Sequence, residues 1–246
     1  MIRILTIDIE TSPLIAYSWG PVYETNLIEV IDQTAVISYS AKWLGGKHIT
    51  KGWPDYKGYK KGRLNDREII KDIWRLLDEA DIIVAQNGKR FDVKVMNARF
   101  LFHGLTAPSP YKIVDTLTEA KKYLRLPSYK LNDICNYYGI GGKVEHEGWG
   151  LWKKCLRGDE KAWKRMLKYN KHDVVLTEKL YLLLLPFIKH PDRNIIEGTR
   201  GKCPSCSSEK LIKRGYAMVK GGSKAKLQCK NCGAWTQGGK EKEIRV

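Results

Sequence analysis

The sequence lacks the features of a membrane or secreted protein. It contains no run of 18 apolar residues, which excludes a membrane-spanning helix. The chain reaches Asp8 before any apolar stretch of signal-peptide length, so we expect an intracellular protein, cytoplasmic or nucleoid-associated. Phenylalanine is scarce, with 4 Phe against 8 Trp and 13 Tyr. Because Trp and Tyr carry polar atoms, some could line a partly wet substrate groove, although most are expected in the core.

Acidic residues are few for the number of basic ones. The chain has 27 Asp and Glu against 44 Lys and Arg, giving a net charge of +17. Such a balance favours polyanionic partners, nucleic acid above all, with an anionic membrane surface as the competing interpretation. Cysteine is also limited to six residues, four of them in two CxxC pairs. This usage indicates metal binding in a reduced protein and not a disulfide framework.

The composition changes near residue 190. From Ile195 onward the chain carries 12 of the 44 basic residues but only 4 of the 27 acidic ones. The stretch from His190 to Lys202 contains Pro191, Gly198 and Gly201 and is typical of a linker. We therefore predict a larger domain over residues 1–190, a linker over 191–201 and a small basic domain over 202–246.

Within the first 190 residues, strand and helix patterns alternate. Expected strands cover 2–9, 81–86 and 112–115, with a hairpin formed by 34–43 and 47–53 around a Gly-Gly pair. Expected helices cover 66–79, 91–103, 116–124, 130–138 and 159–185, from apolar spacing and from their end signals. Strands expected to pair antiparallel come first, and strands that alternate with helices along the chain follow. This order predicts an α/β fold with a mixed sheet flanked by helices.

Two acidic residues end the first predicted strand. Asp8 and Glu10 are two residues apart, so they project from the same face of the strand. Ligand sites of α/β sheets lie at the carboxyl ends of strands, and two close carboxylates repel each other unless a cation lies between them. Taken alone, the Asp-x-Glu pattern is equally compatible with a solvated strand end.

Two further acidic residues lie at suggestive positions. Asp92 is in the first turn of a predicted helix that follows a buried strand; by itself it could be a favourable charge at a helix start. Asp173 shares a helix face with Tyr169, four residues earlier, and belongs to a mostly apolar stripe. An ionised carboxylate there needs a cation or a salt bridge to a nearby Lys or Arg.

Three segments together resemble the DEDD superfamily of 3′→5′ exonucleases, in particular the proofreading domains of family B DNA polymerases. They are Asp8-Ile9-Glu10-Thr11, Asn87-Gly88-Lys89-Arg90-Phe91-Asp92 and Tyr169-xxx-Asp173, and the similarity covers roughly residues 1–188. The superfamily has a His branch and a Tyr branch. Lys168 occupies the position of the branch histidine, whereas Tyr169 fits the Tyr branch, so His172 is expected to be a surface or supporting residue.

The resemblance implies an RNase H-like fold and phosphodiester hydrolysis with two Mg²⁺ or Mn²⁺ ions, which suit all-oxygen ligands. It implies that Asp8 bridges the ions, with Glu10 and Asp173 on the nucleophile side and Asp92 near the leaving group. Tyr169 would orient the attacking water. The residues expected to contact nucleic acid in this domain are Thr11, Asn87 and Phe91.

The two CxxC pairs form a pattern that resembles a zinc ribbon. Cys203-Pro204-Ser205-Cys206 and Cys229-Lys230-Asn231-Cys232 are separated by 22 residues, and four thiolates at this spacing can close a tetrahedral zinc site. Strands are expected over 210–218 and 224–228. The basic residues predicted to bind nucleic acid are Lys213, Arg214, Lys224 and Lys226, with Tyr216 and Trp235 as possible stacking faces. A protein-docking ribbon is the alternative.

The leading hypothesis is therefore a metal-dependent 3′→5′ exonuclease acting on DNA, with single-stranded or frayed 3′ ends as the expected substrate. A DNA polymerase or a replication or repair complex is a possible partner. The alternatives are an RNA-processing exonuclease, a structure-specific endonuclease and, from another class, a non-catalytic adaptor that binds nucleic acid or a polymerase.

Overall fold

The computed structural model describes the chain over residues 2–19, 27–60, 65–142, 147–188, 201–219 and 222–242. The main sheet has five strands in the order β5-β4-β1-β6-β7. Their bounds are β1 Ile4–Thr11, β4 Val36–Trp43, β5 His48–Gly52, β6 Ile82–Ala85 and β7 Lys112–Asp115. β1, β4 and β5 pair antiparallel, whereas β1, β6 and β7 pair parallel. The expected mixed sheet is thus confirmed.

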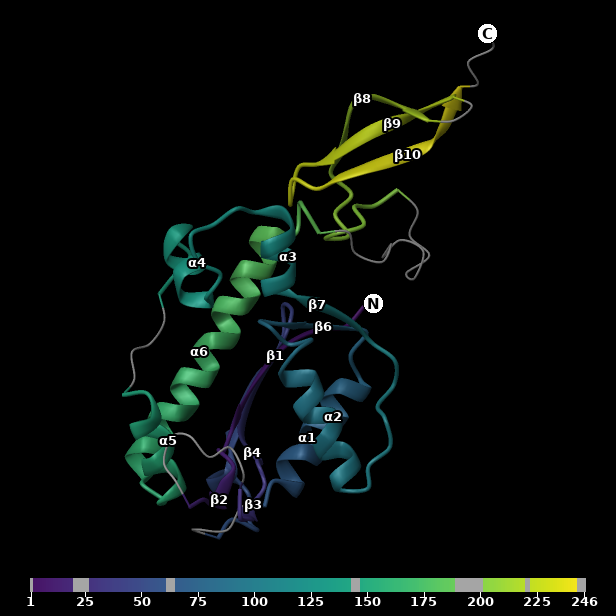
Figure 1. Ribbon diagram of the computed structural model, residues 1–246. Coiled ribbons are helices and arrows are strands. Elements are labelled where there is room, and N and C mark those ends of the chain that lie inside the picture. The colour runs from purple at the N-terminus through teal and green to yellow at the C-terminus, as the bar shows by residue number, and fades with distance from the viewer. Residues whose placement is uncertain are drawn as a thin grey trace.

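Helices cover both faces of this sheet (Figure 1). Their bounds are α1 Arg67–Asp78, α2 Asp92–Phe102, α3 Thr116–Tyr123, α4 Leu131–Tyr137, α5 Trp149–Leu156 and α6 Glu160–Leu184. α6 crosses one face against β1 and β4, and α3, α4 and α5 pack on α6. α1 and α2 pack on the other face. No helix in the described ranges has the length and apolarity needed to cross a bilayer.

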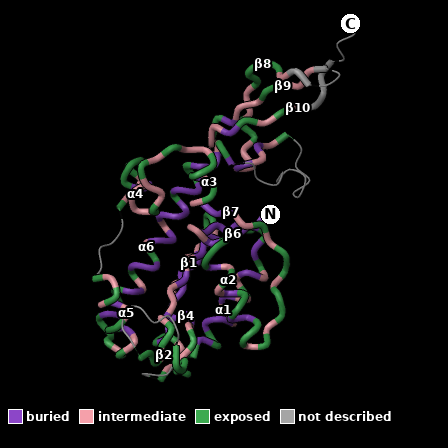
Figure 2. Tube along the Cα trace, in the orientation of Figure 1, coloured by how far each residue is buried: buried purple, intermediate pink, exposed green. Residues whose placement is uncertain are grey.

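The alternation of side chains along β1 explains this layering. Leu5, Ile7 and Ile9 are buried against α1 and α2 in the larger hydrophobic core. Ile4 points to the opposite face and joins a second core cluster with Leu180 of α6. Burial is accordingly concentrated along the sheet and the inner side of α6 (Figure 2). Both faces of β1 are apolar at its start, so the strand is held firmly before its acidic end.

The predicted helices and strands of this region are all present, but several further elements were not predicted. β2 (Ile15–Tyr17) and β3 (Glu29–Asp32) form a separate two-stranded sheet, and each is too short to give a clear alternation. α5 begins with Trp-Gly directly after Gly148, a sequence of low helix propensity. Its buried residues, Leu151 and Cys155, show that packing against α6 stabilises it.

The C-terminal region is a three-stranded antiparallel sheet, consistent with the predicted zinc ribbon. Its strands are β8 Leu211–Val219, β9 Gly222–Cys229 and β10 Trp235–Lys242, in the order β10-β9-β8. β10 was not predicted because Gly238 and Gly239 interrupt its pattern. Of the predicted linker, residues 191–200 lie outside the described residues.

Candidate active site

Three acidic side chains converge at the carboxyl end of β1. Asp8 and Glu10 project from the face that α6 covers, and Asp173 comes from α6 itself, where it is 6% exposed. One carboxylate oxygen from each of the three lies within 4.8 Å of the others. The structure thus brings together three of the four acidic residues that the sequence singled out.

Asp92 lies beside this trio but is not one of the three. It is the first residue of α2, and its Oδ1 accepts a hydrogen bond from the Ile9 backbone N–H at 3.2 Å. The reason is structural: β6 pairs with β1 only as far as Thr6, so the later N–H groups of β1 on that edge lack a strand partner. Asp92 satisfies one of them, and is 2% exposed.

The proximity of these groups changes their acidity. Burial, followed by the charges of Asp92, Glu10 and Asp173, raises the pKa of Asp8 well above its usual range. Burial also raises the pKa of Asp92 to about 7, against the lowering effect of its backbone hydrogen bonds. Carboxylates held this closely are unfavourable when all are ionised, and a bound cation removes that penalty. The donor set consists of oxygens alone, which suits Mg²⁺ or Mn²⁺.

Tyr169 lies on α6 next to the acids, as its spacing from Asp173 predicted. It is 6% exposed, and burial, then the charges of Asp173 and Glu10, raises the pKa of its hydroxyl. Tyr169 is therefore a neutral hydrogen-bonding group at neutral pH. Trp152 of α5 contacts its ring edge-on, with 6.2 Å between the ring centroids. The unpredicted helix α5 thus helps to fix the tyrosine.

Asn170 is a supporting residue that the sequence alone did not reveal. Its Nδ2 donates to Asp8 Oδ2 at 2.6 Å and lies 3.3 Å from the Asp8 carbonyl oxygen. Its Oδ1 accepts from the Ser38 hydroxyl of β4 at 3.3 Å, and the side chain is fully buried. The amide thereby ties the Asp8 carboxylate to the neighbouring strand. The available signal was a polar residue three positions before Asp173, on the same face of the helix.

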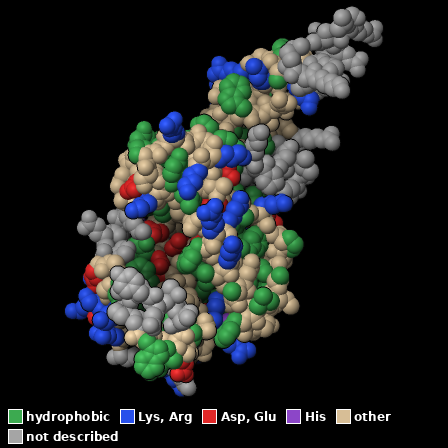
Figure 3. All heavy atoms as spheres, in the orientation of Figure 1, with side chains coloured by type: hydrophobic (Ala, Val, Ile, Leu, Met, Phe, Trp, Pro, Cys, Tyr) green, Lys and Arg blue, Asp and Glu red, His purple; other side chains and the backbone are tan. Residues whose placement is uncertain are grey.

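The acids open into a groove of about 670 Å³. The predicted site residues that line it are Asp8, Glu10, Asn87, Phe91, Asp92, Tyr169 and Asp173. Thr11 is not one of them; it lies at the register shift in the pairing of β1 with β4. The opposite wall comes from α3 and the segment before α4, including Lys121 and Lys130. Figure 3 shows acidic side chains within this hollow and basic side chains gathered beside it.

The turn that carries Asn87 is held by a buried carboxylate. Asp115, at the end of β7, accepts hydrogen bonds from the backbone N–H groups of Asn87 and Lys89 at 3.1 and 3.0 Å. The same carboxylate caps the start of α3. Asn87 adopts a positive φ of 60°, which asparagine tolerates better than most residues. Phe91 follows the turn and is 42% exposed, so its ring is available to a ligand in the groove.

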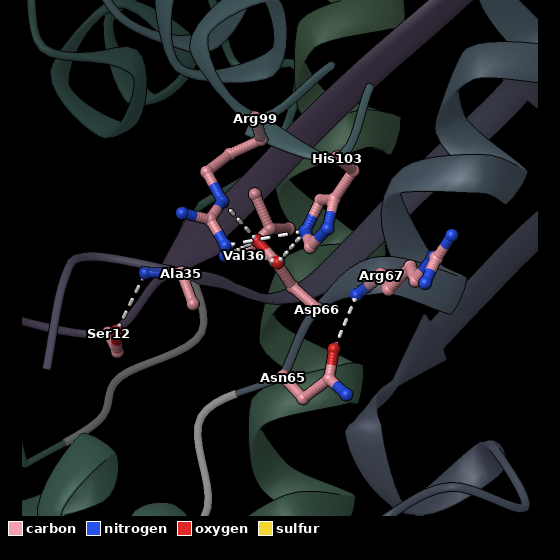
Figure 4. A network of polar contacts seen from close by, with 8 residues as sticks. All are labelled: Ser12, Ala35, Val36, Asn65, Asp66, Arg67, Arg99 and His103. Carbon is pink, nitrogen blue, oxygen red and sulfur yellow. Dashed lines mark hydrogen bonds and ion pairs between the residues drawn. The ribbon is translucent and has the colours of Figure 1, made fainter. Parts of the chain in front are cut away.

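A second buried carboxylate fixes the end of β1 from the opposite face of the sheet (Figure 4). Asp66, fully buried, accepts from Arg99 Nε and Nη2 at 2.8 and 2.6 Å and from the Val36 N–H at 2.9 Å. His103 Nε2 lies 2.6 Å from the same carboxylate. Val36 pairs with Thr11 just beyond the register shift. Asp66 therefore joins β4, α1 and α2 where the acidic strand ends.

Comparison with known proteins agrees with this architecture. A family model of the RNase H superfamily matches residues 40–185, which include Asp92, Tyr169 and Asp173. The chain belongs to the RNase H superfamily. Among solved structures, a family B DNA polymerase from the hyperthermophilic archaeon Pyrobaculum calidifontis is similar, with a TM-score of 0.56 and 18% identity over 75% of this chain. The match spans 25% of that polymerase chain. No curated protein matches the sequence.

Membership of the RNase H superfamily supports a nuclease-type function, with divalent metal ions as cofactors and nucleic acid as the partner. The side chain of His172, adjacent to Asp173, points elsewhere: its Nε2 lies 2.7 Å from the Gly142 carbonyl oxygen. Lys168 is exposed. Both observations agree with the sequence-based interpretation, in which neither residue belongs to the acidic centre.

The four cysteines of the ribbon form a separate cluster. The Sγ atoms of Cys203, Cys206, Cys229 and Cys232 all lie within 4.8 Å of one another. The Cys203–Cys232 and Cys206–Cys229 distances of 3.6 and 3.7 Å exclude disulfide bonds. Although burial opposes it, backbone N–H groups of Cys232 and Asn231 lower the pKa of Cys229 to about 7. The cluster fits a tetrahedral structural zinc site.

Proposed function

We propose that this chain is a 3′→5′ exonuclease that removes nucleotides from single-stranded or frayed DNA ends. The observation that carries the proposal is the convergence of Asp8, Glu10 and Asp173, with ligand oxygens within 4.8 Å, in a groove that also contains Asp92 and Tyr169. This combination supports a two-ion site. When bound, the ions supply Lewis acidity to the attacking and leaving oxygens of the phosphodiester.

Each residue has a distinct role in this proposal. Asp8, held by Asn170, would be the carboxylate that contributes to both ions, because the charges of Asp92, Glu10 and Asp173 all act on it. Glu10 and Asp173 would hold the ion that serves the attacking water, and Asp92 would help to hold the ion on the leaving-group side. The neutral hydroxyl of Tyr169 orients the attacking water by hydrogen bonding.

The groove favours an unpaired 3′ end. Phe91 offers an exposed ring on which a terminal base can stack, and base–aromatic stacking contributes about 1–3 kcal/mol per base. Lys121 and Lys130 line the opposite wall, where they are placed to pair with phosphates. Asn87 is placed to donate to the terminal nucleotide. The choice of DNA follows the likeness to a DNA polymerase in fold.

We also propose the division into an exonuclease domain over residues 1–190, a linker over 191–201 and a zinc ribbon over 202–246. In this arrangement the ribbon keeps the polymer close to the acidic centre. The fold likeness spans only a quarter of the polymerase chain. A DNA polymerase, or a replication or repair complex, is the partner that this likeness favours.

The test is digestion of end-labelled single-stranded and duplex DNA and RNA with Mg²⁺ or Mn²⁺. We expect stepwise loss from the 3′ end of single-stranded DNA. Asp8→Ala and Asp173→Ala should reduce the rate to background while circular dichroism remains unchanged. If either variant digests 3′ ends at the wild-type rate, the site assignment is wrong.

The same assay separates the alternatives. Preference for RNA would indicate an exoribonuclease, and cleavage of closed circles or end-blocked strands would indicate an endonuclease. A complete absence of divalent-dependent cleavage, with nucleic-acid binding retained, would indicate a non-catalytic adaptor.

A further inference from the structure

The strand register of the ribbon divides its side chains between two faces. β9 is the central strand, and its residues alternate. Lys226 and Gln228 point to one face, together with their β10 partners Gln237 and Trp235. Lys224, two residues before Lys226, points to the same face. We name this set, Lys224, Lys226, Gln228, Trp235 and Gln237, the tryptophan face.

The opposite face carries the other exposed aromatic residue. Ala225 and Leu227 of β9 point to it, and their β8 partners are Tyr216 and Lys213. We name this set the tyrosine face. The sequence had suggested a single basic surface with both aromatic rings. The register separates them, so only one aromatic residue can act together with Lys224 and Lys226.

The two aromatic rings differ in availability. Tyr216 is 51% exposed, but Lys213 Nζ lies 4.1 Å from its ring centroid and donates to its hydroxyl at 2.7 Å. Trp235 is 53% exposed. Within the described residues of the ribbon, no ring or cation contacts its indole. The exposed part of the Trp235 indole therefore offers a surface on which a planar ligand can stack.

The charges on the tryptophan face are also available. In the described part of the ribbon the ion pair present is Lys202 with Glu209, and neither Lys224 nor Lys226 has a carboxylate partner there. Residues two apart on a strand are separated by about 7 Å, so the two ammonium groups can contact different phosphates. An open aromatic ring beside unpaired cations is the combination that binds single-stranded nucleic acid.

We propose that the tryptophan face of the ribbon binds single-stranded nucleic acid, with a base stacked on Trp235 and phosphates paired with Lys224 and Lys226. This inference rests on the proposed function, because the strand bound by the ribbon would be the substrate of the exonuclease. It goes further by naming the face and by requiring unpaired bases, since a base within a duplex cannot stack on an indole at the surface.

The experiment measures binding of a fluorescent oligothymidine to the full-length protein carrying Asp8→Ala, which prevents digestion. Trp235→Ala should weaken binding by about fivefold to a hundredfold, from the usual contribution of one stacked base. Replacing Lys224 and Lys226 by Ala should reduce the slope of log affinity against log salt by about 1.4, or about 0.7 per phosphate contact.

Matched controls come from the tyrosine face. Tyr216→Ala and Lys213→Ala should change affinity by less than about twofold, and the zinc content of every variant should equal that of the parent protein. A blunt duplex of the same length should bind at least about tenfold more weakly. Wild-type affinity of Trp235→Ala, an equal loss in Tyr216→Ala, or equal binding of duplex would each overturn the proposal.

Failure here is distinguishable from failure of the proposed function. Trp235→Ala in the otherwise unchanged protein should retain its maximal rate and raise KM on long single strands. If Trp235→Ala behaves as the parent protein in binding while divalent-dependent digestion persists, the face assignment alone is wrong. If digestion is absent but Trp235-dependent binding is present, the nuclease proposal alone is wrong.

Discussion

The protein has two clusters of metal-ligating side chains that are built in opposite ways. The acidic centre takes its groups from segments as distant as Asp8 and Asp173 and rests on an extensive hydrophobic core. In the ribbon, Cys203 and Cys229 are themselves part of a very small core, with Ala234 as the other buried member. The acidic centre is therefore organised by the fold, whereas the fold of the ribbon is organised by its cysteines.

The largest expected effect follows from removing zinc. Zinc sites of small domains contribute about 10–16 kcal/mol to folding, so a zinc chelator or Cys229→Ser should unfold the ribbon. Hydrogen exchange should show rapid exchange of the amides of β8 to β10, with β1, β4 and β6 still protected. Withholding Mg²⁺ and Mn²⁺ should leave both regions protected. If the ribbon amides stay protected without zinc, the ribbon does not depend on its cysteines for folding, and the proposed difference between the two regions is wrong.

The next effect concerns what organises the acidic centre. Asp66→Ala leaves Arg99 buried without its carboxylate, which should lower the free energy of unfolding by about 3–5 kcal/mol in urea titrations. The control is Glu68→Ala, which removes an exposed pair with Lys71 and should cost less than about 0.5 kcal/mol. Equal effects of the two variants would show that the core network does not support the strand end.

The third prediction concerns the cost of ionising the acidic centre without metal. The pKa of Asp92 is raised to about 7 in the folded state, so folding retains its proton where the unfolded chain has lost it. In buffer free of Mg²⁺ and Mn²⁺, stability should fall on the order of 3 kcal/mol as the pH rises from about 4 to 7. Asp92→Asn should make this dependence shallower in urea titrations across that range, and the slope that remains is expected from the raised pKa of Asp8. An unchanged slope in the variant would exclude Asp92 as the source.

The smallest effect concerns the support of a single ligand. Asn170→Ala removes the hydrogen bond to Asp8, and loss of such a supporting contact lowers metal affinity by about tenfold to a hundredfold. Calorimetric titration with Mn²⁺ in the absence of nucleic acid measures this directly. His172→Ala, on the same helix but bonded to Gly142, should stay within about twofold. Parent-like Mn²⁺ affinity of Asn170→Ala would assign the amide a purely structural role.

The sequence could predict the features that depend on local spacing, but not those that depend on how distant elements pack. Asp8 and Glu10 on one strand face, and Tyr169 and Asp173 on one helix face, follow from local periodicity alone. The CxxC pairs also predict their own proximity. Asn170 and the Asp66–Arg99 pair could not be predicted, because their partners lie 162 and 33 residues away and depend on how elements pack.

The hydrogen bond between Asp92 and the Ile9 N–H has a practical consequence for the choice of inactive proteins. Truncation of Asp92 to Ala would remove an acidic group and also leave a buried donor of β1 unsatisfied, so a lost activity would confound chemistry with misfolding. Asp92→Asn keeps an acceptor oxygen at that position. Asp8→Ala removes one acceptor of the Asn170 amide but leaves the Asp8 carbonyl oxygen as the other, which makes it the safer reference for an inactive protein.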